Sequence, residues 1–498
     1  GPFRLSKNLR VFSFRGREGF LFMIKYSWVI QMLERPENKR NQMQVVDLEM
    51  LVPEDHLLRK IDKLLNFDRI YDFVEHLYCA DNGRPAVDPV VLFKIVFIQH
   101  LFGIRSLRQT VQEVDMNIAY RWFLGFDLTT KIPHFATVSY AFATRFPSET
   151  FEQVFQWILE EAVMRGCVDP STVFIDATHI KANANRRKYT RELAKKTAKI
   201  YDEQLWEEIN KERVAEGKKP LKPKKKDEEV TVTKSKTDPE SGMFHKGEHQ
   251  RDFAYTAHVA CDRRNFILNS VVTPGNVHDS TVFDSVYDPL VERFPQIETI
   301  AVDAAYKTPW LCKKIIDDGR NPSMPYKRPM SKKGFYRPYE YVYDEYYNCV
   351  ICPHNQVLPY STTNRNGYRE FRSNPEICVT CPGLSKCTES KNHQKVVTKH
   401  IWYDYVELAE DFRHSKAGRE SYARRSETIE RVFADAKEKH GMRYTLHKGL
   451  ARVSNWAKLK FAAMNLKKLA LWVFRDPLFY FFSLKITPQM QKRCFSVI

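Results

Sequence analysis

The segment Ser171-Thr172-Val173-Phe174-Ile175-Asp176 is a short apolar and β-branched run that ends in a carboxylate. Such a run predicts a buried β-strand. The segment Glu298-Thr299-Ile300-Ala301-Val302-Asp303 repeats the pattern and also ends in an aspartate. We therefore expect two buried strands, each with one carboxylate at its end.

The segments around these strands complete an α/β pattern. Residues 252–261 and 265–273 are predicted to form a hairpin, and 278–291 a helix. A helix over 308–318 and a short strand near 324–326 follow the second aspartate. The order is strand, strand, strand, helix, strand, helix, strand, with one late helix. This order is typical of a ribonuclease-H-like α/β fold.

The late helix is expected to begin near Ala423 and to stop at Gly441. One apolar stripe follows its helical period: Ile429, Val432, Phe433 and Ala436. Glu430 projects beside that stripe, and Lys437 follows it by seven residues, which is about two helical turns. An ordinary surface glutamate is the alternative for Glu430.

Helical spacing also dominates residues 48–146. Asp88-Pro89 predicts the start of an apolar helix that Gly103 stops, and a short helix follows over 106–114. Arg105 and Arg108 stand near the start of that short helix. The arrangement is similar to a helix-turn-helix that contacts DNA through these arginines, although an ordinary helical bundle explains the spacing equally well.

The chain is basic, with a net charge of +18. Sixteen Lys or Arg and seven Asp or Glu fall within residues 181–226, so the charge is concentrated there. This segment is either a solvated linker or an extended arm that contacts phosphates. The arm would use Lys222, Lys224, Lys225 and Lys226. A 43% hydrophobic content excludes wholesale disorder, and no apolar run is long enough to predict a membrane helix.

Five of the ten cysteines are clustered. Two C-x-x-C hooks and one later cysteine make up the cluster: Cys349, Cys352, Cys378, Cys381 and Cys387. Two such hooks predict one structural Zn²⁺ in tetrahedral coordination. Cys381 and Cys387 compete for the place of fourth ligand. Reduced core cysteines and an iron–sulfur cluster are the alternatives.

Four blocks in order give the chain a family resemblance. They are Phe174-Ile175-Asp176-Ala177-Thr178, Thr273 to Ser280, Val302-Asp303-Ala304-Ala305-Tyr306, and Thr428-Ile429-Glu430-Arg431-Val432-Phe433 with Lys437. The chain resembles the DDE transposases of bacterial insertion sequences, which belong to the ribonuclease-H-like (integrase) superfamily. It is most similar to a subgroup with a helical DNA-binding domain and a Cys-rich insertion before the catalytic glutamate.

The resemblance implies a division into domains. The expected parts are an N-terminal extension (1–44), a helical DNA-binding domain (45–165), a ribonuclease-H-like core (166–329 with 413–475, including a basic insertion over 181–250), a Cys-rich zinc-binding insertion (330–412) and a C-terminal tail (476–498).

The resemblance also implies the chemistry. Asp176, Asp303 and Glu430 would hold two Mg²⁺ or Mn²⁺ ions, with Asp176 bridging both ions. Glu427 is an alternative to Glu430, because Arg425 stands five residues before Glu430 where the family signature has four. His278 and Asp279 would orient the site or cap their helix. Arg431 and Lys437 would contact phosphate.

We therefore expect a transposase that binds the terminal inverted repeats of its element and then cleaves and joins DNA. Its partners would be double-stranded DNA, at the element ends and the target, and a second copy in a homodimer. No membrane is involved, and the expected location is the cytoplasm, at the nucleoid. The alternatives are a ribonuclease-H-like nuclease without strand transfer and an inactive zinc-containing DNA-binding protein.

Overall fold

The computed structural model describes residues 6–16, 19–29, 45–79, 86–195, 201–222, 229–246, 250–328 and 332–475. The chain divides into two compact units, Gly1–Leu51 and Val52–Ile498. The first unit contains an antiparallel hairpin of β1 (Ser6–Gly16) and β2 (Gly19–Val29), and the short helix α1 (Leu48–Leu51). The hairpin lies within the expected N-terminal extension, for which the sequence indicated no particular element.

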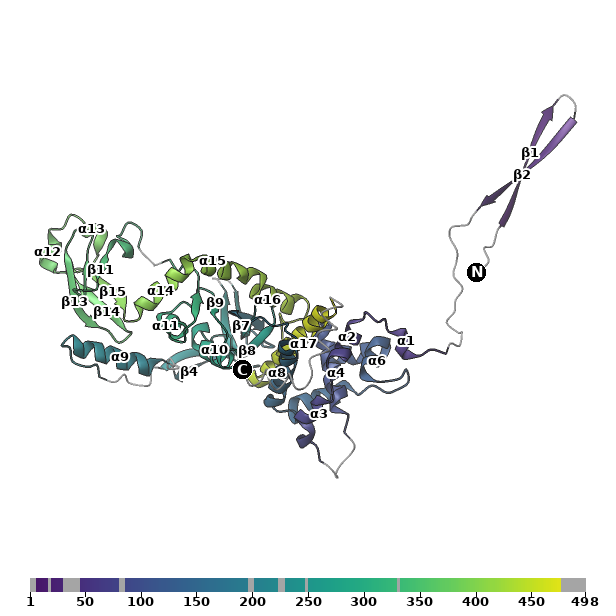
Figure 1. Cartoon of the computed structure of the whole chain (residues 1–498), viewed down its shortest axis with the longest axis horizontal. Coiled ribbons are helices and arrows are strands. Elements are labelled where there is room, and N and C mark those ends of the chain that lie inside the picture. The colour runs from purple at the N-terminus through teal and green to yellow at the C-terminus, as the bar shows by residue number, and fades with distance from the viewer. Residues whose placement is uncertain are drawn as a thin grey trace. The chain divides into compact units, whose positions relative to one another are not determined.

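The second unit begins with a bundle of helices (Figure 1). They are α2 (Leu57–Leu64), α3 (Arg69–Val74), α4 (Pro89–Leu101), α5 (Leu107–Met116), α6 (Ile118–Leu124), α7 (Phe135–Tyr140) and α8 (Ser148–Met164). Asp88 caps α4 by accepting a hydrogen bond from Val90 N at 2.7 Å, and Pro89 is its first residue, as predicted. The helix is buried on most of its circumference.

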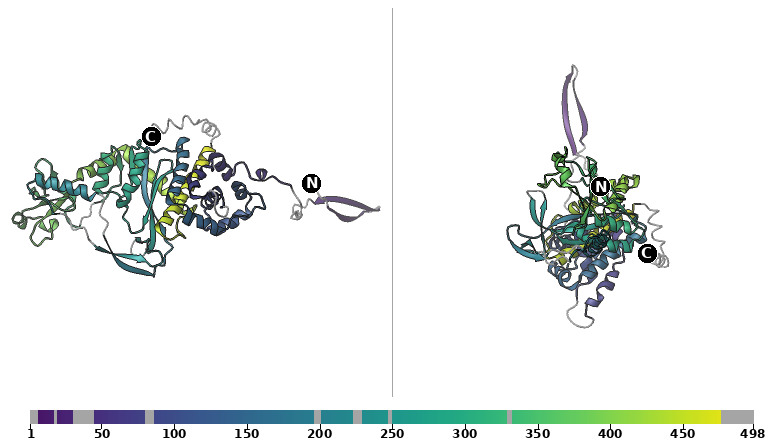
Figure 2. Two further views of the ribbon diagram at one scale, coloured as in Figure 1. Left: turned by 90° about the horizontal axis from the view of Figure 1, so that it is seen from below. Right: turned by 90° about the vertical axis from the view of Figure 1, so that its left-hand side faces the viewer.

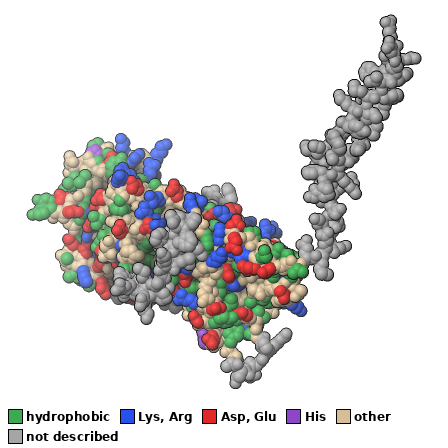
Figure 3. Space-filling model, turned by 45° about the vertical axis from the view of Figure 1, so that its right-hand side comes forward, with side chains coloured by type: hydrophobic (Ala, Val, Ile, Leu, Met, Phe, Trp, Pro, Cys, Tyr) green, Lys and Arg blue, Asp and Glu red, His purple; other side chains and the backbone are tan. Residues whose placement is uncertain are grey.

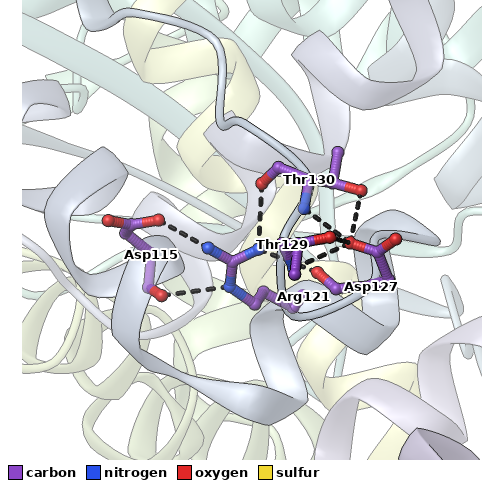
Figure 4. Close-up of polar contacts among 5 residues, drawn as sticks. All are labelled: Asp115, Arg121, Asp127, Thr129 and Thr130. Carbon is purple, nitrogen blue, oxygen red and sulfur yellow. Dashed lines mark hydrogen bonds and ion pairs between the residues drawn. The ribbon is translucent and has the colours of Figure 1, made fainter.

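A buried arginine ties the loops of this bundle together (Figure 4). Arg121 donates from Nε to the carbonyl oxygen of Asp115, and from Nη1 to those of Asp127 and Thr130. Its Nη2 lies 2.5 Å from Asp115 Oδ1. Hydrogen bonds from Thr130 and Thr129 lower the pKa of Asp127 to about 2. The guanidinium fork thus fixes three backbone carbonyls at one point.

The main sheet of the second unit has eight strands, five of which form its mixed parallel and antiparallel centre. They are β3 (Thr172–Lys181), β7 (Gln250–Cys261), β8 (Ile267–Pro274), β9 (Thr299–Val302) and β10 (Asn321–Ser323). Their spatial order is β8-β7-β3-β9-β10, with β3, β9 and β10 parallel and β7 antiparallel to both of its neighbours. Helix α10 (Asp279–Arg293) precedes β9, and α11 (Pro309–Asp317) precedes β10. The expected order of elements is thus present.

The basic segment is more structured than the predicted arm. The basic segment contributes β4 (Tyr189–Lys195) and α9 (Asp202–Ala215), and the rest of the basic insertion (181–250) contributes β5 (Glu229–Ser235) and β6 (Gly242–Lys246). The strands extend the main sheet, because β6 pairs with the first half of β7 while β8 pairs with the second half. The segment is therefore largely built into the fold.

A second, five-stranded sheet follows. Its strands β11 (Val342–Asp344), β12 (Cys349–Ile351), β13 (Val357–Thr363), β14 (Tyr368–Arg372) and β15 (Val396–His400) pair in chain order, all antiparallel. Helices α12 (Pro375–Val379) and α13 (Leu384–Cys387) lie between β14 and β15. Helix α9 lies along this sheet (Figure 1), where Arg213 Nη1 donates to Thr363 O at 2.7 Å.

The last helices return to the main sheet and to the bundle. They are α14 (Tyr403–His414), α15 (Lys416–Ala423), the 3₁₀ turn η4 (Arg424–Glu427), α16 (Ile429–Glu438) and α17 (Leu450–Val473). Helix α17 packs against α2, α4 and α8 of the bundle, and Figure 2 shows it in yellow beside the purple and blue helices of the bundle. Asn465 on α17 exchanges two hydrogen bonds of 2.8 Å with the backbone of Ile267 in β8. The bundle and the sheet therefore share one core.

Gly103 marks where α4 meets the end of α16. It has a φ of +66°, and a Cβ there would lie 2.3 Å from Lys439 O. Only glycine fits this left-handed turn without moving the neighbouring backbone. None of the helices in the described part of the chain is both long and apolar enough to cross a membrane.

Candidate active site

The two predicted strand carboxylates lie at the same level of the sheet. Strands β3 and β9 are parallel neighbours, and Ile175 pairs with Val302. Asp176 and Asp303 are the residues that follow this pair. Asp303 comes directly after β9, as predicted. Asp176 does not end its strand, because β3 continues to Lys181; the prediction of a strand end at Asp176 was wrong.

Burial and neighbouring charges perturb Asp176. Burial raises the pKa of its carboxyl to about 6, and the charges of Asp303 and Asp279 add to the increase. Arg425 acts in the opposite direction. Neighbouring carboxylates repel one another when all are ionised, and a cation bound between them offsets this repulsion.

Arg425 is the cation that contacts this group. Its Nη2 lies 2.6 Å from Asp176 Oδ2, and both side chains are largely buried. The backbone N–H of Ala177 donates to the other oxygen, Asp176 Oδ1, at 2.8 Å. Arg425 Nε is buried and has no hydrogen-bond partner among the described residues. The sequence did not predict this contact, because Arg425 and Asp176 are 249 positions apart.

His278 and Asp279 have different positions. His278 is exposed and caps α10, where its Nδ1 accepts a hydrogen bond from Ser280 N. Asp279 is partly buried, and burial followed by the charge of Asp303 raises its pKa. Asp279 therefore belongs electrostatically with the two strand carboxylates, whereas His278 has the capping role.

Two buried residues next to this group were not predicted. His258 on β7 has Nδ1 3.8 Å from Asp279 Oδ1 and 3.4 Å from the hydroxyl of Tyr306. Burial raises the pKa of Tyr306, and the charges of Asp279, Asp176 and Asp303 raise it further. Burial lowers the pKa of His258 to about 4, so its ring is neutral at pH 7. The pair lies beside Asp279. The sequence offered only a histidine within a strand and a tyrosine shortly after Asp303.

Glu430 stands apart from these contacts. It is in the first turn of α16, whose apolar stripe Ile429, Val432, Phe433 and Ala436 is buried as predicted. Glu430 itself is exposed, as are Arg431 and the alternative Glu427. Among the described residues, no hydrogen bond or ion pair reaches the Glu430 side chain.

The donor set fits hard divalent cations in part. Asp176 and Asp303 supply oxygen ligands, which Mg²⁺ and Mn²⁺ prefer. The described residues nevertheless contain no group of three or more His, Cys, Asp or Glu side chains placed to hold a metal ion. The carboxylates of the sheet are thus in place, and Glu430 has not joined them.

Only some of the five cysteines of the predicted zinc site lie close together. Cys387 Sγ lies 3.3 Å from the hydroxyl of Tyr341, and the charges of Cys387 and Cys352 both act on that tyrosine. Cys349 is in β12, one residue before Val350, which packs in the small core with Tyr341. Because side chains alternate along a strand, Cys349 points away from that core. Cys378 and Cys381 flank the end of α12, where Cys381 N donates to Cys378 O.

The predicted DNA contacts are scattered over the second unit. Arg105 and Lys437 line one cleft, although they come from different ends of the chain. Arg108 stacks on Phe135, with its guanidinium carbon 4.6 Å from the ring centre. Lys222 is exposed, whereas Lys224, Lys225 and Lys226 lie outside the described residues. On the face in Figure 3, Lys and Arg are interspersed with Asp and Glu.

Two family models match the chain. A transposase domain (DUF772) matches residues 46–144, and a transposase DDE domain matches residues 351–470. The chain is a DDE transposase of the insertion-sequence type. No curated protein and no solved structure matches it.

The two matches identify the enzyme class of the transposase and DNA as its partner. The protein is a DNA transposase, with polynucleotidyl transferase and endonuclease activity that depends on Mg²⁺ or Mn²⁺. The first match covers the helices from α1 to just beyond α7, including Arg105 and Arg108. The second covers Glu430 and Lys437 but begins at residue 351, downstream of both Asp176 and Asp303.

Proposed function

We propose that this transposase binds the terminal inverted repeats of its own element, pairs two ends as a homodimer, cleaves them and joins them to target DNA. The strand order β8-β7-β3-β9-β10 supports a ribonuclease-H-like core. The observation that carries the proposal is the placement of Asp176 and Asp303 at one level of adjacent parallel strands. Carboxylates so placed suit divalent cations that act on a phosphodiester.

In this proposal Asp176 and Asp303 are the sheet ligands and Glu430 is the helix ligand. When bound, the cations would activate the attacking oxygen and stabilise the leaving oxygen. Asp176 must be ionised to bind a cation. Its raised pKa means that it holds its proton more tightly than an exposed aspartate does. Arg425 favours the ionised form, because its guanidinium is 2.6 Å away.

Glu430 completes the site by movement of the start of α16. The 3₁₀ turn η4 and Thr428, with φ −112° and ψ −96°, separate α15 from α16. This short irregular connection allows the first turn of α16 to shift toward the sheet. The exposed Glu430 carboxylate could then reach the cations that Asp176 and Asp303 hold.

Structural zinc stays a prediction from the cysteine spacing. Cys352 and Cys387 both pack near Tyr341, which supports these two cysteines as ligands. Cys378 and Cys381 enter the proposed set from the spacing of their hook alone. Cys349 fits that set poorly, because it points away from Tyr341.

A strand-transfer assay tests the function. Duplex DNA from the ends of the element is incubated with supercoiled target DNA and Mn²⁺. Joined donor–target product is expected. Cleaved ends without joining would instead support a nuclease, and end binding without cleavage would support an inactive DNA-binding protein.

A further inference from the structure

A basic cleft lies where the helical bundle meets the last helices of the chain. It has a volume of about 860 Å³ and lies between the α4–α5 turn and the segment from α16 to α17. Five basic residues line it: Arg105, Lys437, Arg443, Arg452 and Lys460. Its one acidic residue, Glu438, is paired with Arg443. The lining therefore has a strong excess of positive charge.

Two of these cations are available to a ligand. Arg105 and Arg452 are exposed, and neither makes a hydrogen bond or ion pair with the described residues. Lys460 differs, because it is buried, donates to the carbonyl oxygen of His440 and lies 4.7 Å from the centre of the Trp456 ring. Cations held at a cleft without partners attract an anion.

Aromatic side chains line the same cleft. Tyr444 is 41% exposed and Trp456 is half-buried, and both contribute to the walls. A basic groove with aromatic rings is the means by which proteins hold unpaired nucleotides, with phosphates on the cations and bases stacked on the rings. The volume is that of a small-ligand pocket, which accommodates one or two nucleotides rather than a duplex.

The cleft is connected to the candidate active site by two elements. Helix α16 carries Glu430 in its first turn and Lys437 in its last, about 10 Å apart along the helix axis. Strand β3 carries Asp176 and ends at Lys181, whose backbone exchanges hydrogen bonds with Arg443 O and Thr445 N. A strand cleaved at the carboxylates could thus continue into the cleft.

We propose that this cleft binds a short unpaired DNA strand next to the cleavage site. Arg105 and Arg452 contact its phosphates, and Tyr444 stacks on a base. The inference rests on the proposed function only for the source of the strand, which is the frayed end of the element. Binding itself requires neither the metal nor the carboxylates.

The test is fluorescence anisotropy with a labelled 12-mer oligothymidylate in EDTA, and with a 12-base-pair duplex as the second probe. The Arg105→Gln/Arg452→Gln variant should reduce the salt slope for the oligothymidylate by about 1.4, or 0.7 for each phosphate contact. Tyr444→Ala should weaken binding of this probe by about fivefold or more. The matched controls, Lys416→Gln and Tyr346→Ala, replace residues that are 87% and 89% exposed outside the cleft and should leave binding unchanged.

The outcomes separate this inference from the proposed catalysis. Asp176→Asn should bind the oligothymidylate like the wild type, whether or not the wild type cleaves DNA. An unchanged salt slope in the double variant, or an effect of Tyr444→Ala no larger than that of Tyr346→Ala, would overturn the inference. Equal losses for the duplex and the oligothymidylate would also overturn it, because the cleft would then not select unpaired DNA.

Discussion

Arg425 Nη2 lies 2.6 Å from Asp176 Oδ2, and the two residues form a buried ion pair between the turn before α16 and the central strand. The pair places a positive charge on the carboxylate that we propose as a metal ligand. Arg425 therefore supplies the counter-charge when no cation is bound, and it links η4 to the sheet.

Replacing Arg425 should destabilise the metal-free protein. Arg425→Gln leaves a buried carboxylate without its partner, so we expect the free energy of unfolding to fall by about 3 kcal/mol in EDTA. Mn²⁺ should reduce this loss, because the cation replaces the missing charge. Urea unfolding with and without Mn²⁺ measures both values. Arg424→Gln, at the exposed neighbouring position, is the control. An equal loss with and without Mn²⁺ would show that the pair is purely structural.

Glu430 and Glu427 offer a matched comparison, because both are exposed and only three residues apart. Glu430→Gln should abolish cleavage and leave DNA binding intact, since metal ligation serves the chemistry and phosphate contacts provide most of the affinity. Glu427→Gln should cleave at close to the wild-type rate. Gel assays measure cleavage and DNA binding by both variants. Cleavage by Glu430→Gln and none by Glu427→Gln would assign the metal ligand to Glu427 instead.

The cysteines can be separated by metal analysis. Purified protein should contain about one zinc ion, and Cys387→Ser should lose it, together with stability of the five-stranded sheet. Cys349→Ser should retain the ion, because Cys349 points away from Tyr341. Zinc-free wild-type protein would refute the site, and loss of zinc from Cys349→Ser alone would restore that residue to the ligand set.

The junction between the bundle and α16 should be sensitive to acid. His440 is buried, and its Nδ1 lies 2.7 Å from His100 O. Burial lowers its pKa to about 4, below the value near 6.5 expected in the unfolded chain. The neutral ring thus contributes stability that is present above pH 6.5 and lost as the pH falls toward 4.

Between pH 7.5 and pH 5 this loss should reach about 2 kcal/mol for His440. Urea unfolding of the wild type and of His440→Asn at the two pH values isolates it, because the asparagine cannot take up a proton. A fall in stability of the same size in both proteins would assign the acid sensitivity to other groups.

Local patterns predicted the elements well. The cap at Asp88, the start of α10 after His278 and the buried stripe of α16 all depend on residues within a few positions of one another. The end of β3 was wrong because the charged Asp176 was taken as a boundary, although the buried Thr178 and Ile180 beyond it keep the period of a strand.

Contacts between distant segments could not be predicted in this way. No local pattern indicates that Arg425 pairs with Asp176, that His258 and Tyr306 lie beside Asp279, or that Arg105 shares a cleft with Lys437. The basic segment was misjudged for the same reason. Its composition indicates a solvated arm, and only pairing with β7 and packing of α9 on the second sheet bring it into the fold.

The central claim is that Asp176 and Asp303 together support metal-dependent cleavage and joining of DNA. The most direct measurement is the strand-transfer assay with Mn²⁺, comparing the wild type with Asp303→Asn. Asp303 is only partly buried and follows its strand directly, so the asparagine should leave the fold and end binding intact. The account predicts joined product from the wild type and none from Asp303→Asn; joined product from the variant within a few-fold of the wild type would contradict it.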